Sequence, residues 1–177
     1  ATYESILQGV LYNDTSDTPN LTARNIDVVV SDGALSSAIS TVTVNMTAVN
    51  DAPLAAITSA SYSATEQTGL TLKGTGLAIS DVDADTGAMT VTLSVGEGTL
   101  NVTAGGSGAV VSNSGTSSVT ISGTVAQINA LLGADATSTV SYINSSDNPG
   151  ASTTLTLSVS DNGNTGGGTL TASDTAT

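Results

Sequence analysis

Met89–Val95 reads MTVTLSV, and in it apolar residues alternate with Thr or Ser. Successive side chains of a strand point to opposite faces, so this pattern predicts a half-buried β-strand. The same alternation recurs, less regularly, at 26–30, 39–44, 118–121 and 155–159. Clusters of Gly, Asn, Asp and Ser lie between these segments, as is typical of turns. The sequence therefore predicts an all-β fold, an antiparallel sandwich with about seven strands in a complete unit.

One segment departs from the strand pattern. Residues 124–133 place Val125, Ile128 and Leu132 on one face of a helix, and Gly133 stands where a helix commonly ends. We expect a short helix there, capped by Gly133.

The composition excludes several classes of function. The 177 residues include fifteen acidic and two basic ones, for a formal net charge of −13. Nucleic acids and anionic membrane surfaces are therefore not expected as partners, and no apolar run is long enough to insert into a membrane. The chain has no Cys and no His, which removes thiolate chemistry and the commonest general base. We expect no catalytic residues.

An internal repeat is visible in the sequence. Tyr12–Pro19 matches Tyr142–Pro149 at an offset of 142 − 12 = 130, and Val30–Gly33 matches Val159–Gly163 at an offset near 129. This pattern predicts the C-terminal part of one repeat plus its linker in residues 1–52, and a nearly complete second repeat in residues 53–177. Each complete repeat would carry one short helix.

Two segments are rich in hard oxygen ligands. Residues 79–85 read ISDVDAD and residues 50–53 read NDAP. Carboxylates at alternate positions repel one another at neutral pH unless a cation or water separates them. Calcium binds about six to eight such oxygens, so both segments are candidates for a Ca²⁺ site.

Together these motifs resemble a known family. Asn50–Pro53, Asp81–Asp85, the strand start at Gly98–Leu100, the helix at Ala126–Asn129 and Val159–Asp161 are similar to the cadherin-like repeats of large bacterial calcium-dependent adhesins, of the RTX-adhesin type. The resemblance covers nearly the whole chain. It implies an Ig/cadherin-like sandwich, export by a type I system, and calcium bound where successive repeats join.

We expect one strand to rise through Leu70 to Ile79, and counting strands up and down the sandwich then places several acidic loops at the end where the linker enters. The predicted calcium ligands are Asn50, Asp51, Asp81, Asp83, Asp161, Asp14 and Asp17. Each of these residues taken singly is also a common turn former, and Asp85 is read as a cap of its loop. Glu66 and Asp147 would lie at the opposite end, either as ligands of a further junction or as solvated turn residues.

The function expected from these features is mechanical. The chain would be a non-catalytic, calcium-rigidified extender of an extracellular or cell-surface bacterial adhesin, with adjacent repeats as its partners. Three alternatives stay open at this point: a self-associating subunit of a fibre or surface layer, a glycan-binding module, and a hydrolase built on two carboxylates. The scarcity of aromatic residues, with four Tyr and no Phe or Trp, disfavours sugar stacking and an aromatic cleft.

Overall fold

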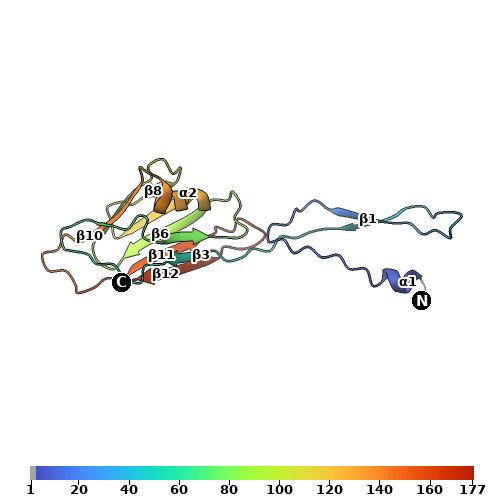
Figure 1. Ribbon diagram of the computed structural model, residues 1–177, viewed down its shortest axis with the longest axis horizontal. Coiled ribbons are helices and arrows are strands. Elements are labelled where there is room, and N and C mark those ends of the chain that lie inside the picture. The colour runs from blue at the N-terminus through green and yellow to red at the C-terminus, as the bar shows by residue number, and fades with distance from the viewer. Residues whose placement is uncertain (1–2) are drawn as a thin grey trace. The chain divides into compact units, whose positions relative to one another are not determined.

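The computed structural model describes residues 3–177 and consists mainly of antiparallel β-sheets (Figure 1). The predicted all-β class is thereby confirmed. The chain divides into two compact units, Ala1–Ala48 (unit 1) and Val49–Thr177 (unit 2). The sequence placed the boundary at Ala52–Pro53, so the Asn50–Asp51 segment falls in unit 2.

Unit 1 contains a short helix and one hairpin. Helix α1 spans Tyr3–Leu7, and strands β1 (Arg24–Val28) and β2 (Ser40–Val44) pair antiparallel with Ile26 opposite Val42. Its large apolar side chains are exposed, Leu11 by 90%. In the described part of unit 1 only Ala48 is a buried hydrophobic residue, so these strands have no core of their own.

Unit 2 contains ten strands where the sequence predicted about seven. They are β3 (Leu54–Ile57), β4 (Leu70–Thr71), β5 (Leu77–Ser80), β6 (Met89–Val95), β7 (Thr99–Thr103), β8 (Val110–Ser112), β9 (Ser118–Gly123), β10 (Thr139–Ile143), β11 (Leu155–Ser160) and β12 (Thr171–Ala176). Five form a sheet in the order β12-β11-β6-β9-β8, three form β4-β10-β7, and β3 pairs with β5.

One of the additional strands arises where the chain changes sheets. The sequence predicted one strand rising through Leu70 to Ile79, whereas β4 pairs with β10 and β5 pairs with β3. Gly76 lies at the change with φ +97°, and a Cβ there would stand 1.8 Å from Thr58 Oγ1. Glycine is needed at this position because both the backbone conformation and the close approach exclude a side chain.

The core follows from the alternation in the sequence. In β6, Met89, Val91 and Leu93 have no exposed surface, and the residues between them are half-buried. Leu93 lies opposite Leu157 of β11 and Val119 of β9 in the ladder. All three belong to one buried cluster that also draws on the other two sheets. Burying each such aliphatic side chain stabilises the fold by about 1.5–3 kcal/mol.

The predicted helix is present but ends differently. Helix α2 spans Val125–Asn129 and begins with a capping box, in which Thr124 and Gln127 exchange side-chain and backbone hydrogen bonds. It continues as the π-helical turn η1, Ala130–Ala134, which buries Leu131 and Leu132. The prediction of Gly133 as the cap was wrong, because the chain stays helical through this residue and leaves the helix at Asp135.

Loops that match in sequence between unit 1 and unit 2 have the same pattern of hydrogen bonds within each loop. Asp14 Oδ1 accepts from the Ser16 N–H at 3.1 Å, and Asn144 Oδ1, 130 residues later, accepts from the Ser146 N–H at 3.0 Å. The Ser16 and Ser146 hydroxyls then accept from Thr18 N–H and Asn148 N–H respectively. A second pair follows the β1 and β11 strands: Asp32 Oδ1 accepts from Ala34 and Leu35, and Asp161 Oδ1 accepts from Gly163 and Leu170.

Candidate metal site

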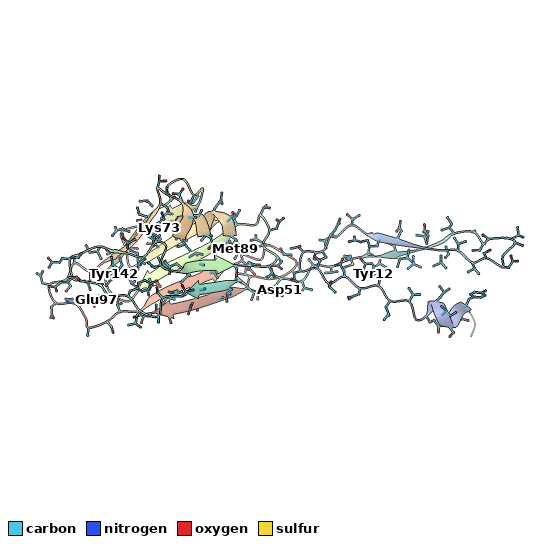
Figure 2. The ribbon with its side chains drawn as sticks, viewed as in Figure 1. Tyr12, Asp51, Lys73, Met89, Glu97 and Tyr142 are labelled. Carbon is cyan, nitrogen blue, oxygen red and sulfur yellow. The ribbon has the colours of Figure 1, made fainter. Side chains whose placement is uncertain are left out.

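Five of the seven predicted ligand residues lie together at one end of unit 2. They come from the segment before β3, the β5–β6 loop and the β11–β12 loop, and we call them the carboxylate cluster: Asn50, Asp51, Asp81, Asp83 and Asp161. Hydrogen bonds between side chain and backbone join the three segments. Asp51, labelled in Figure 2, marks this end of unit 2.

The segment before β3 is held by two bonds from Asn50 and one from Asp51. Asn50 Nδ2 donates to Asp161 Oδ2 at 2.6 Å and to the Gly168 carbonyl at 2.9 Å. The Asp51 N–H donates to Asp83 Oδ2 at 3.0 Å. The chain therefore enters unit 2 bonded to both acidic loops.

The β5–β6 loop is shaped by its own first carboxylate. Asp81 Oδ1 accepts from the N–H groups of Asp83 and Ala84, each at 3.1 Å. Asp85 closes the turn at φ 44°, a left-handed conformation that Asp tolerates better than most residues. The Asp85 side chain is exposed.

Both carboxylate oxygens of Asp161 accept hydrogen bonds from other residues of the protein. It is 1% exposed, and its Oδ1 accepts from the Gly163 and Leu170 N–H groups at 2.8 Å. Burial by itself would raise the pKa of Asp161, but these two backbone bonds and the Asn50 amide hold the pKa below its usual value. Asp161 is therefore an ionised anchor that orients Asn50.

Three buried oxygens of the cluster have no hydrogen-bond partner in the part of the chain that the structure describes: Asn50 Oδ1, Asp81 Oδ2 and Asp83 Oδ1. Asp83 is 2% exposed. The Asn50 amide nitrogen faces two acceptors, so its oxygen is the atom left over. Buried acceptors without a partner cost about 1–3 kcal/mol each, more when charged, and such groups require an explanation.

The electrostatics of the cluster are unfavourable to its paired carboxylates. Burial raises the pKa of Asp81, and the neighbouring Asp83 carboxylate raises it further. Neither basic residue contacts the cluster: Arg24 pairs with Asp14, and Lys73 Nζ donates to the Asp135 carbonyl. Two adjacent carboxylates without a cationic partner destabilise the loop that carries them.

The donor set fits a hard cation. Across residues 3–177 no three Asp, Glu, His or Cys side chains are grouped so as to hold a metal ion by themselves. The unpartnered oxygens instead belong to two carboxylates and one amide. Calcium accepts this mixture and completes its shell with backbone carbonyls and water, whereas zinc and copper prefer the His and Cys that the sequence lacks.

The remaining two predicted ligands belong to unit 1. Asp14 Oδ2 lies 3.8 Å from Arg24 Nη2, and Asp14 Oδ1 accepts from Ser16. Asp17 is exposed. Both residues lie in the loop before β1.

Sequence reasoning missed some groups that build the cluster. The Thr165 hydroxyl donates to the Asp83 carbonyl at 2.6 Å and so joins the two acidic loops. The Gly168 carbonyl fixes Asn50. Nothing in a Thr-rich and Gly-rich loop distinguishes these two residues, since only the folded loop brings them near the cluster.

No protein-family model, characterised protein or solved structure was found to match this chain. In residues 3–177 every helix has five residues, and none is long and apolar enough to cross a bilayer. The likeness to cadherin-like repeats thus stays a prediction from the sequence. Among the described residues, the carboxylate cluster is the strongest candidate for a functional site, because three of its buried oxygens have no hydrogen-bond partner.

Proposed function

We propose that this chain is a non-catalytic, calcium-rigidified extender of a large bacterial extracellular or cell-surface adhesin. One observation carries the proposal: buried oxygens of Asn50, Asp81 and Asp83 have no partner at the point where the chain enters unit 2. A bound Ca²⁺ would supply the positive charge and the ligand contacts that these three atoms lack.

The mechanism is a clamp on the entering segment. Asn50 and Asp51 are already bonded to the loops of Asp161 and Asp83, so a cation shared by Asn50, Asp81 and Asp83 would fix that segment to the end of unit 2. Without the cation, repulsion between Asp81 and Asp83 opposes the closed arrangement. Asp14 and Asp17 of unit 1 stay ligands predicted from the sequence.

Two observations support a tandem array. The loops beginning at Tyr12 and Tyr142 have the same pattern of turn hydrogen bonds. The loops beginning at Asp32 and Asp161 also resemble each other in this way. Adjacent repeats of the same longer chain are therefore the proposed partners. The absence of His and Cys from the sequence favours a mechanical role over a catalytic one.

A second candidate is a self-associating subunit of an extracellular fibre. The β1–β2 hairpin favours it, because each strand pairs only with the other and Leu35, Ile39 and Val42 are exposed. Unpaired strand edges readily accept a strand from another molecule. Sedimentation velocity over a range of concentrations distinguishes the two: the extender stays monomeric, whereas the fibre subunit forms larger species as concentration rises.

Calcium titration calorimetry on the 177-residue protein tests the extender proposal directly. We expect a dissociation constant on the order of 10⁻⁴–10⁻³ M, as for other extracellular modules. Asp83→Ala should lose most of the binding heat, whereas Asp27→Ala should bind as the parent does, since Asp27 accepts only from Thr41 in unit 1. Small-angle scattering should show a narrower range of extension with calcium for the parent and not for Asp83→Ala. Binding heat that is unchanged in Asp83→Ala would remove the cluster as the calcium site.

A further inference from the structure

The end of unit 2 away from the carboxylate cluster contains a pocket of about 300 Å³. Figure 2 labels two of its residues, Glu97 and Tyr142, at the opposite end of unit 2 from Asp51. Buried apolar residues and acidic residues both line the pocket, and we call the first set its floor and the second its wall. Its principal lining residues are Tyr62, Leu72, Val95, Glu97, Tyr142 and Leu155.

The floor is part of the core and is therefore preformed. Leu72, Val95, Tyr142 and Leu155 are 2–9% exposed and belong to the buried cluster of unit 2. Tyr62 is fixed beside them, because its N–H donates to the Thr177 carbonyl at 2.8 Å and its hydroxyl lies 3.0 Å from Thr75 Oγ1. Rigid aliphatic and tyrosine surfaces favour a ligand with a hydrocarbon body.

The wall carries a fixed negative charge. Glu97 Oε2 accepts from the Gly150 N–H at 2.9 Å, and the Glu97 N–H donates to Thr153 Oγ1 at 2.9 Å. The Asn144 side chain and the Gly150 N–H lower the pKa of Glu97, so it is ionised at neutral pH. Glu66 adds a second carboxylate to the lining.

Within the described residues of unit 2, no basic side chain lines the pocket to balance this wall. The lining contains neither Lys nor Arg, and the one ion pair in residues 3–177 joins Arg24 to Asp14 in unit 1. Tyr62 and Tyr142 are among the lining residues, and aromatic rings attract cations through their negative face. Acidic, aromatic and apolar groups in one small pocket are complementary to a cation with an attached hydrocarbon group.

We propose that this pocket binds a small organic cation, in which an ammonium or guanidinium group is joined to a compact hydrocarbon body. The hydrocarbon would lie on Leu72, Val95 and Leu155, and the cationic group would face Glu97. A pocket of this size lies at the lower limit of small-molecule sites, which are about 300–1,000 Å³. This site goes beyond the proposed calcium clamp and does not depend on it, since the two share no residue.

Three probes of matched shape test the proposal: cyclohexylmethylamine, the neutral cyclohexylmethanol and the anionic cyclohexanecarboxylate. Each is titrated into the ¹⁵N-labelled 177-residue protein in calcium-free buffer, and the amide signals of Gly150, Thr153 and Tyr142 are followed. We expect the amine to move these signals, with the alcohol about tenfold weaker and the carboxylate without effect. This comparison needs no variant and so does not depend on the folding of one.

A variant pair tests the role of the charge. Glu97→Gln keeps an acceptor for the Gly150 N–H and removes one of the two carboxylates of the lining, so the preference for the amine over the alcohol should fall clearly below about tenfold. Glu4→Gln removes the same charge from α1 in unit 1 and should retain the preference. Three results would overturn the proposal. The first is equal binding of all three probes, and the second is binding of none. The third is that calcium moves the same signals and that adding the amine does not displace it.

Discussion

Replacing Asp83 by Asn should change the stability of unit 2 in opposite ways with and without calcium. The substitution conserves shape, and the Asn oxygen can still accept from the Asp51 N–H that Asp83 Oδ2 now binds at 3.0 Å. What it removes is the buried one of two adjacent carboxylates. The Asp83 carboxylate contributes to the raised pKa of Asp81, so its removal relieves repulsion in the metal-free protein. In chelator we therefore expect Asp83→Asn to be as stable as the parent or slightly more stable.

With calcium the order should reverse. A ligand that binds only the folded state at a hundredfold excess over its dissociation constant stabilises that state by about 2.7 kcal/mol. Unit 2 has 177 − 48 = 129 residues, a size at which this free energy raises the melting temperature by about 10 °C. Asp83→Asn removes one carboxylate of the proposed calcium site and so neutralises half of the pair. It should lose most of this increment.

The assay is differential scanning calorimetry of the parent and two variants across about 0.1–100 mM calcium at constant ionic strength. The matched control is Asp85→Asn. It removes the same charge two residues further along the chain, where the side chain is exposed and Asn also tolerates the backbone φ of 44°. It should keep the full calcium increment. A parent whose melting temperature is the same in calcium and in chelator would refute the reasoning, and so would an Asp83→Asn increment equal to that of the parent.

Three other outcomes follow from the structure. Leu93→Ala should destabilise unit 2 by about 2–5 kcal/mol in urea unfolding, whereas Leu11→Ala should have little effect, because Leu93 is fully buried and Leu11 is 90% exposed. Asp135→Asn should lower the free energy of unfolding at neutral pH, because bonds from Thr137, Ser138 and Gly106 hold the ionised form of Asp135 and lower its pKa. The loss relative to the parent should disappear as the pH falls through this lowered pKa. A loss that stays constant with pH would contradict this. Amide hydrogens of β1 should exchange faster than those of β6 in a dilute monomer, because the hairpin lacks a core.

Local pattern accounts for what could be predicted of the fold. Met89–Val95 alternates without interruption, and β6 has the same bounds and the same alternation of burial. The predicted strands at 118–121 and 155–159 reappear as β9 and β11, each extended by one or two residues. A strand buried on one face needs only this period of two, so its position can be inferred from adjacent residues.

Local pattern failed where a distant partner decides the conformation. Residues 70–79 look like one strand, yet β4 and β5 join different sheets because β10 and β3 supply their partners. Gly133 looks like a helix cap, yet η1 continues through it and buries Leu131 and Leu132 against the core. In both cases tertiary packing overrides the local preference.

The sequence by itself determined the chemistry available to the protein: an excess of carboxylates, no His or Cys, and strands of alternating apolar and hydroxyl residues. Only the tertiary structure decided which carboxylates are exposed and which are buried together. Asn50 meets Asp161 across 111 residues, and Glu97 meets Gly150 across 53. Such pairings depend on the order of strands in the sheets, so desolvation, unpaired oxygens and the shape of a pocket appear only after the chain has folded.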